Sequence, residues 1–297
     1  MKATILRENL HKALSFVSRI TSVKAQLPIL STILLKTEDG RLRLVATNLE
    51  TTVSFWIGAT IEQEGAIAVP ALLLSEVVSS LAYEKTELRT EKNSLILEGD
   101  ESEASLNGLP AEEFPPLPSG GGAEQNKIEK EVLKNVLSHV LIAVSTDESR
   151  PILTGVKISE EGKKTVFAAT DGFRLSVEKI PSHGTFGEGV LVPAKALGEV
   201  TKMLDNENSA EIKMQLDAKG GRVTFASSQA EVVTRLIEGA FPAYEKIIPS
   251  KWTTRVKLDR EDFVKAVRLA QVYAKETANI VKLVTGEGKT IVTANSP

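Results

Sequence analysis

The sequence contains no cysteine and only three histidines, and this scarcity excludes several kinds of chemistry. Without cysteine there is no disulfide bond, no thiol nucleophile and no cysteine-ligated metal. The histidines are His11, His139 and His183, and their separation does not match a histidine metal site. The Gly-x-Ser-x-Gly turn that carries the nucleophile of many hydrolases is absent too. The residues therefore predict no catalytic activity, and we expect no cofactor or metal.

Long apolar segments are also missing. No run approaches the roughly 18 apolar residues that cross a bilayer, and charged residues interrupt the N-terminus before any signal-peptide core forms. Together with the lack of cysteine, this predicts a cytoplasmic protein without a membrane partner. Hydrophobic residues make up 42% of the chain and charged residues 25%, which is typical of globular domains. The formal charge of −3 argues against a strongly basic nucleic-acid binder but permits a basic surface on one side.

The chain contains a duplication. Pro151 lies 123 residues after Pro28 (151 − 28), and the same offset relates other short motifs around them. Each motif set predicts a β-hairpin, beginning at 27 or 150 and turning at 38–41 or 160–164. The matching segments are 27–30 with 150–153, 46–49 with 169–172, and 69–71 with 192–194. A constant offset without slippage indicates one domain present twice.

Two helices per copy follow from apolar residues at helical spacing. In the first copy we expect helices over 10–20 and 71–81, with Pro70 as the first-turn proline of the second. Its apolar side is predicted to consist of Leu73, Val77, Val78 and Leu81. In the second copy the corresponding helices are expected over 133–144 and 194–204.

A third copy begins at Val256, with a helix from Arg260 and a hairpin over 280–295. Half a repeat cannot bury its own sheet face, so we expect the chain to be truncated at its C-terminus. The predicted fold is α+β, with two complete copies of one unit and a partial third. The expected domains are 1–118, 128–250 and 251–297, with a glycine-rich linker at 119–127.

Basic residues lie opposite the apolar side of each first helix. In any single helix this placement is explained by solvation of the exposed face. Its recurrence in three copies favours a continuous basic surface, with the helices together on a concave side. The residues are Lys12 and Arg19, Lys130 and Lys134, and Lys265 and Arg268.

Several motifs resemble the bacterial sliding clamp, the beta subunit of DNA polymerase III. They are Thr-Asp-Gly-Phe-Arg-Leu at 170–175 and Phe-Pro-Ala-Tyr at 241–244, together with 27–30, 46–50 and 150–155. The resemblance implies tandem DNA-clamp domains, each with two helices on antiparallel sheets. In the family these form a head-to-tail homodimeric ring with helices lining the hole. Because the third copy is incomplete, we expect this chain to be monomeric or weakly associated.

The resemblance also implies partners. Duplex DNA would thread the ring and be held by topology, with weak phosphate contacts and no sequence readout. The clamp itself would hydrolyse no nucleotide, since a separate ATP-driven clamp loader opens the ring. The DNA polymerase III catalytic subunit, the clamp loader and other proteins with a clamp-binding motif would dock through a hydrophobic peptide pocket.

Two sets of site residues are implied by the resemblance. Lys24, Arg150 and Lys195 match DNA-facing positions of the family. The partner pocket corresponds to Leu153, Thr170, Gly172, Phe173, Arg174, Leu175, Pro242, Lys246 and Ile247. Phe173 stands where histidine is common in the family, and Lys246 where arginine is common.

The pocket assignment has a competing interpretation. Leu153 and Leu175 could simply be paired hairpin core, although this explains Phe173 and Arg174 less well. As a pocket, the apolar side chains would form a floor, and Gly172 would let a peptide backbone approach closely. We therefore predict a DNA sliding clamp, a processivity factor. The alternative is a repeat-built protein-interaction scaffold that does not encircle DNA, and an enzyme ranks third.

Overall fold

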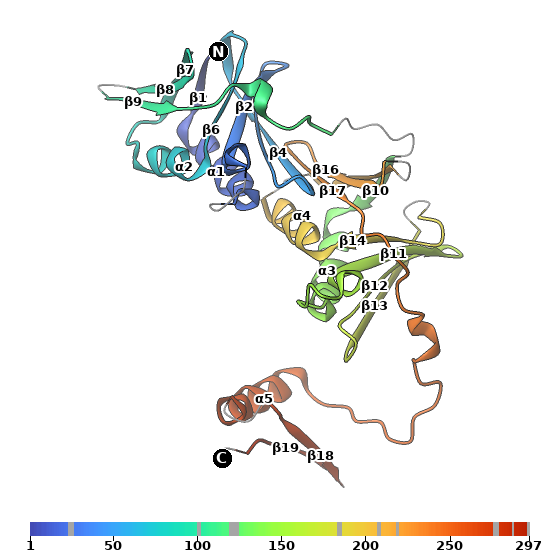
Figure 1. The fold of residues 1–297 in the computed structure, drawn as a ribbon. Helices are drawn as coiled ribbons and strands as arrows, with labels where there is room; N and C mark the ends of the chain where they lie inside the picture. Colours follow the sequence, from blue (N-terminus) through green and yellow to red (C-terminus); the bar gives the residue numbers. More distant parts are fainter. Residues whose placement is uncertain are drawn as a thin grey trace. The chain divides into compact units, whose positions relative to one another are not determined.

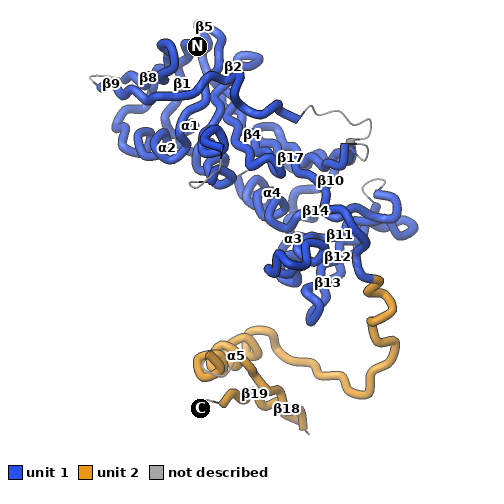
Figure 2. Tube along the Cα trace, in the orientation of Figure 1, with its two compact units in different colours: residues 1–242 blue, residues 243–297 orange. Residues whose placement is uncertain are grey.

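The computed structural model describes residues 1–22, 27–99, 102–118, 125–182, 186–206, 209–217, 220–275, 279–286 and 288–295. These residues form two compact units, Met1–Pro242 and Ala243–Pro297 (Figure 2). Within the described ranges, no helix has the length and apolar character needed to cross a membrane.

The first unit contains two sets of elements, shown in Figure 1. We call β1–β9 with α1 and α2 the first copy, and β10–β17 with α3 and α4 the second copy. The first copy has β1 (Lys2–Leu6), α1 (Arg7–Val17), β2 (Thr32–Glu38), β3 (Arg41–Thr47), β4 (Thr51–Gly58), β5 (Thr60–Gln63), β6 (Ala66–Pro70), α2 (Ala71–Ser80), β7 (Lys85–Glu91), β8 (Ser94–Gly99) and β9 (Ser102–Asn107). The second has β10 (Gln125–Glu129), α3 (Lys130–Val140), β11 (Gly155–Glu161), β12 (Lys164–Thr170), β13 (Leu175–Pro181), β14 (Val190–Pro193), α4 (Ala194–Asn206), β15 (Glu211–Asp217), β16 (Arg222–Ala226) and β17 (Ala230–Arg235).

The duplication predicted from the motifs is visible in the elements. Strand β11 begins at Gly155 and β2 at Thr32, which is again an offset of 123 (155 − 32). The pairs α1 with α3, β3 with β12 and α2 with α4 keep the same offset at their first residues. The mixed α+β fold, with few helices on antiparallel sheets, agrees with the predicted class.

One sheet passes through both copies. Its eight strands have the order β10-β15-β16-β17-β4-β3-β2-β6, and all pairs are antiparallel. The copies meet where β17 pairs with β4, with Thr234 opposite Thr51. The first copy adds a sheet of order β5-β1-β7-β8-β9, and the second adds β13-β12-β11-β14. In the second copy, the strand that corresponds to β4 is therefore an edge, because β13 pairs only with β12 among the described strands.

The helices cover one side of these sheets. In Figure 1, α2, α1, α4 and α3 follow one another along that side. Helix α1 buries Leu10, Leu14 and Val17, and α3 buries Leu133, Leu137 and Val140 at helical spacing. These side chains belong to one apolar core that includes strands of both copies.

Three local predictions are wrong. The residues at 28–31 and 151–154 form short 3-10 turns ahead of the hairpins, since proline fixes φ and supplies no N–H to a strand. In α2, Leu74 is fully buried whereas Leu73 is 44% exposed. Pro70 ends β6 and caps the helix rather than opening it. Because β6 pairs with β2 up to Pro70, the strand sets the rotation of α2 and turns Leu73 outward.

The second unit contains α5 (Arg260–Ala274) and a hairpin of β18 (Lys282–Gly286) and β19 (Lys289–Thr293). Asp259 caps the helix by accepting the N–H groups of Glu261 and Asp262. The helix and hairpin predicted here are confirmed, and their reading as a third copy stays a prediction. Of the expected linker, 119–124 lies outside the described residues, and 125–127 belong to β10.

Candidate partner and nucleic-acid interface

The loop between β12 and β13 has a closed network of hydrogen bonds. The Asp171 carboxylate accepts the N–H groups of Phe173 and Arg174, both at 2.9 Å. The Thr170 hydroxyl donates to the Arg174 carbonyl at 2.7 Å and accepts the N–H of Gly172 at 3.0 Å. Gly172 has φ +94°, a conformation that side chains disfavour. The loop is therefore held in one shape before any partner arrives.

The electrostatics of this loop follow from the same contacts. The N–H groups of Arg174 and then Phe173 hold the pKa of Asp171 below its ordinary value, with the Arg174 guanidinium adding to the effect. That guanidinium donates from Nε to Asp171 Oδ2 at 2.8 Å. Asp171 therefore stays ionised at neutral pH, and its contact with Nε restrains the guanidinium end of the Arg174 side chain.

An aromatic ring stands out from this ordered backbone. Phe173 is 95% exposed, the highest value among the large apolar side chains described. Leu175, two residues further along the chain, is half-buried, as is Leu153 before β11, and Thr170 is buried. Their partial exposure means that these leucines are not enclosed in the core and that part of each side chain is accessible to a partner. The arrangement can therefore offer apolar contact and an exposed guanidinium to a peptide.

Arg150 lies at the same loop. Its Nη1 is 3.6 Å from the point where a Cβ on Gly172 would stand. Its Nε donates to Asp147 Oδ2 at 3.0 Å. The hydroxyl and N–H of Ser149, followed by this guanidinium, lower the pKa of Asp147. The structure thus brings a predicted DNA-facing residue next to the predicted partner pocket.

Lys195 is at the start of α4 and pairs with the segment before Arg150. Its Nζ lies 2.6 Å from Glu148 Oε1, and the two side chains are 90% and 77% exposed. The hydrogen bond and charge of Glu148 raise the pKa of Lys195. Exposed ion pairs of this kind contribute little stability, so the ammonium can exchange Glu148 for another anion.

The remaining predicted site residues are not brought to this loop by the described contacts. Lys24 lies outside the described residues. Pro242 is exposed and ends the first unit. Lys246 and Ile247 are exposed residues of the second unit, and their place in the pocket stays a prediction.

Acidic partners of the basic helix residues were missed by the sequence reasoning. Each of the four basic residues predicted on the first helices of the two complete copies has a nearby oxygen partner. The contacts are Lys12 with the Asn206 carbonyl (3.2 Å), Arg19 with Glu199 (3.4 Å), Lys134 with Asp205 (2.7 Å) and Lys130 with Glu131 (3.9 Å). Two of these contacts, those of Lys12 in α1 and of Arg19 in the 3-10 turn after it, join the first copy to α4 of the second. Three of these four positive charges thus have a carboxylate within 4 Å, so they do not form a uniform positive field.

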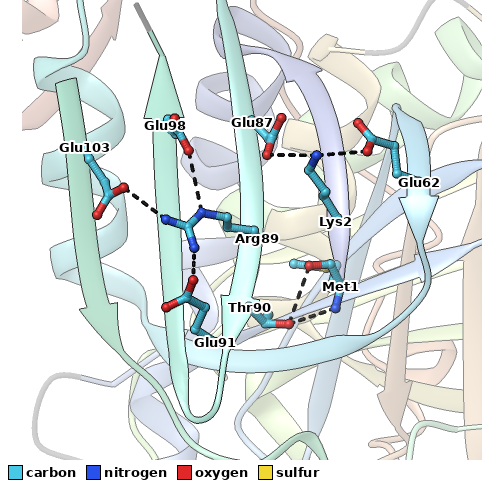
Figure 3. Close-up of polar contacts among 9 residues, drawn as sticks. All are labelled: Met1, Lys2, Glu62, Glu87, Arg89, Thr90, Glu91, Glu98 and Glu103. Carbon is cyan, nitrogen blue, oxygen red and sulfur yellow. Dashed lines mark hydrogen bonds and ion pairs between the residues drawn. The ribbon is translucent and has the colours of Figure 1, made fainter. Parts of the chain in front are cut away.

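A contrasting surface lies on the five-stranded sheet (Figure 3). Lys2 and Arg89 each contact more than one carboxylate there. The hydrogen bond from Lys2 to Glu62 is the main cause of a raised Lys2 pKa. The carboxylates are Glu62, Glu87, Glu91, Glu98 and Glu103. Carboxylates outnumber cations on this sheet, which disfavours contact with phosphates.

Comparison with known proteins gives concordant results. Residues 1–118 match the family described as DNA polymerase III beta subunit, N-terminal domain, and residues 127–243 match its central domain. The Beta sliding clamp of Bacillus subtilis strain 168 is 30% identical over 312 residues, covering 100% of this chain and 81% of that protein. The Beta sliding clamp of Synechocystis is 29% identical, covering 95% of this chain and 77% of that protein.

Solved structures agree with these sequence matches. A DnaN sliding clamp from Bartonella birtlesii bound to griselimycin superposes with a TM-score of 0.94 at 28% identity, covering 100% of this chain and 81% of that one. The DNA polymerase sliding clamp from Bacillus subtilis gives a TM-score of 0.92 at 29% identity, with the same coverage.

Proposed function

The chain belongs to the family of bacterial DNA polymerase III beta subunits, the beta sliding clamps, and we propose that it encircles duplex DNA as a processivity factor in the bacterial cytoplasm. The match of two successive clamp domains, over 1–118 and 127–243, is the observation that carries this conclusion. In this proposal two chains with complete third domains close head to tail into a ring, and the protein has no catalytic activity of its own.

The helix side of the first unit suits a protein that slides. Deep phosphate contacts would bind DNA tightly and make the affinity depend steeply on salt. Here the basic side chains are already paired with nearby oxygens, so a phosphate replaces an existing partner and gains little. DNA is then retained by the closed ring and not by affinity, which leaves it free to move through.

The loop at 170–175 is the proposed partner site. A short hydrophobic peptide of the polymerase III catalytic subunit, the clamp loader or another clamp-binding protein would pack on Phe173 and Leu175. Support comes from the exposure of Phe173 and from the hydrogen bonds that hold its backbone. A loop ordered in advance loses little conformational entropy on binding.

Encirclement is tested by topology. The chain, at a concentration where sedimentation shows dimers, is loaded with a clamp loader and ATP on nicked circular DNA and separated by gel filtration. We expect protein to stay with the circle and to leave after one restriction cut. Equal loss from circular and linear DNA would contradict encirclement and favour the interaction scaffold.

The partner site is tested with a peptide carrying the clamp-binding motif of the polymerase III catalytic subunit. Phe173→Ala and Leu175→Ala should each weaken binding by about 1–3 kcal/mol, a usual cost at an interface hot spot. The matched control is Leu72→Ala, which removes another exposed apolar side chain (60% exposed), on α2 of the first copy. Unchanged affinity in both site variants would remove these residues from the site.

A further inference from the structure

A hollow lies at the junction of the two copies, entirely within the first unit. Its volume is about 430 Å³. The turn between β3 and β4, a proline-rich segment and the ends of β16 and β17 form its walls. The lining residues are Thr47, Leu49, Glu50, Thr52, Pro115, Pro116, Pro118, Arg222, Val233, Thr234 and Arg235. We call this set the junction groove.

The junction groove corresponds by repeat to the predicted partner pocket. Thr47, Leu49, Glu50 and Thr52 lie 123 residues before Thr170, Gly172, Phe173 and Leu175 (170 − 47). Pro115 lies 127 residues before Pro242 (242 − 115). The duplicated domain therefore places a hollow in the first copy at the position where the second copy carries its proposed peptide site.

The turn at 47–51 is ordered in the same way as its counterpart. Asn48 Oδ1 accepts the N–H groups of Glu50 at 3.1 Å and Thr51 at 2.7 Å. Leu49 has φ +75°, a conformation that a leucine rarely adopts, and its side chain is 49% exposed. Opposite, buried Phe114 packs on the β2–β3–β6 face and anchors the proline segment. The groove thus has an apolar floor between two fixed walls.

Two arginines give the groove an unusual charge. Arg222 and Arg235 stand directly opposite each other on β16 and β17, so their side chains share one face. Like charges in this position repel. Asp217 stands opposite Arg222 on its other neighbour, β15, but no ion pair within the described ranges involves either guanidinium. Glu50 is the one carboxylate among the described lining residues of this groove. The same arginines also line a neighbouring hollow of about 940 Å³, so they are reachable from two sides.

We propose that the junction groove binds an extended peptide of a partner protein in which carboxylates flank an apolar side chain. Guanidinium groups bind carboxylates through paired N–H donors, and an incoming carboxylate would relieve the repulsion between the arginines. Leu49 and the prolines would receive the apolar side chain without losing backbone freedom of their own. The analogy to the second copy rests on the proposed partner site, whereas the hollow and the arginine pair stand independently of it.

The test uses the whole chain, labelled with nitrogen-15, and two peptides. One is acetyl-Glu-Leu-Asp-Leu-Glu-amide, and its matched control is the uncharged acetyl-Gln-Leu-Asn-Leu-Gln-amide. We expect the acidic peptide at about 1 mM to shift the amide resonances of 47–52 and 233–235, and the control to bind about tenfold more weakly. Arg222→Gln and Arg235→Gln should each weaken the acidic peptide by about tenfold. Lys213→Gln, on β15 of the same sheet, should have no effect.

Stability measurements separate binding from folding. Arg235→Gln should leave the melting temperature unchanged or raise it, because it removes the repulsion with Arg222. Leu49→Gly copies the residue of the second copy, relieves the positive φ and should retain stability while weakening the peptide. A fall in melting temperature with every variant would mean a structural role and overturn the proposal.

Other results would also overturn it. Shifts confined to 170–175 would mean that the acidic peptide uses the proposed partner site, which would then still stand. Arginine-dependent binding of a short single-stranded oligonucleotide, without peptide binding, would assign the groove to nucleic acid. If the clamp-binding peptide does not bind at Phe173, only the proposed partner site is contradicted. Binding to the junction groove is measured independently, from the amide resonances of 47–52 and 233–235.

Discussion

The two turns that follow β3 and β12 have nearly the same backbone but opposite surroundings. Each turn begins after a strand that ends in a threonine, whose hydroxyl accepts the N–H two residues later. The residue after that threonine is Asn48 in the first copy and Asp171 in the second, and its side-chain oxygen accepts two further N–H groups. In the first copy the next strand, β4, is covered by β17. In the second, β13 remains an edge among the described strands, and Phe173 projects from its turn.

This difference shows how duplication separates structure from function. The hydrogen bonds within a turn are local, so both copies keep them. What the turn contacts depends on the strand beside it. In the first copy β17 of the second copy pairs with β4, whereas in the second copy β13 is left as an edge among the described strands. The covered turn contributes to the joint between copies, and the open turn is available as a proposed binding site.

The largest predicted effect concerns the apolar core that both copies share. Leu44 and Phe167 are repeat counterparts and both are fully buried. Because one sheet and one core include both copies, each should lower the stability of the whole first unit when replaced by alanine. We expect losses of about 2–5 kcal/mol for Leu44→Ala and about 3–5 kcal/mol for Phe167→Ala.

The measurement is urea unfolding followed by the fluorescence of Trp56, which lies in the first copy, in a background where Trp252 is replaced by phenylalanine. A shift of the Trp56 transition by Phe167→Ala would show that the copies unfold together. An unchanged Trp56 transition would mean that the copies are separate folding units despite the shared sheet.

A smaller effect is expected at the joint itself. The hydroxyls of Thr51 and Thr234 lie 3.0 Å apart and are buried. Thr234→Val keeps the shape and leaves the Thr51 hydroxyl without this partner, so it should cost about 1–3 kcal/mol. Replacing both threonines by valine should cost less than the sum of the single changes. The control is Arg174→Ala, the exposed counterpart of Thr51, which should change the free energy of unfolding by less than about 0.5 kcal/mol.

The open turn offers a subtler comparison. Asn48 shows that an amide oxygen can accept the same N–H groups as the Asp171 carboxylate. Asp171→Asn should therefore preserve the turn, whereas Asp171→Ala should disorder it and weaken the clamp-binding peptide at Phe173. Equal peptide affinity in both variants would mean that the turn geometry does not matter for binding.

The charge of Asp171 adds a pH dependence to the second turn alone. Its pKa is lowered in the folded chain, so its stabilising effect is complete above the pKa of the unfolded chain and is lost as the pH falls through the folded value. As the pH falls, the protection of the Phe173 and Arg174 amides against hydrogen exchange should decrease relative to that of the matching amides of the first turn, Glu50 and Thr51. With Asp171→Asn this dependence should disappear. Its persistence in that variant would assign it to another group.

Much of this fold could be predicted because it depends on local pattern. The 123-residue offset predicted the matching hairpins, and helical spacing identified the inward residues of α1 and α3. Each of these depends on residues close together in sequence.

The features that were missed depend on distant segments. Helix α2 turns Leu73 outward because β6 fixes its start, and Arg19 meets Glu199 because α4 packs beside α1. The covering of β4 by β17 is likewise a pairing across the duplication. Local spacing carries no information about such contacts, which explains why the basic helix residues were expected to form a continuous basic surface.

The smallest predicted effect tests how the two copies share DNA contact. Lys195 and Leu72 are repeat counterparts, and both are exposed at the start of their helices. If Lys195 meets phosphates, Lys195→Ala should reduce the slope of log affinity against log salt by at most about 0.9, measured by anisotropy of a labelled duplex between about 50 and 200 mM salt. Leu72→Lys should increase the slope, again by at most about 0.9. Because Lys195 must first leave Glu148, its change should be the smaller of the two. Equal affinity at all salt concentrations in both variants would place these positions away from the DNA path.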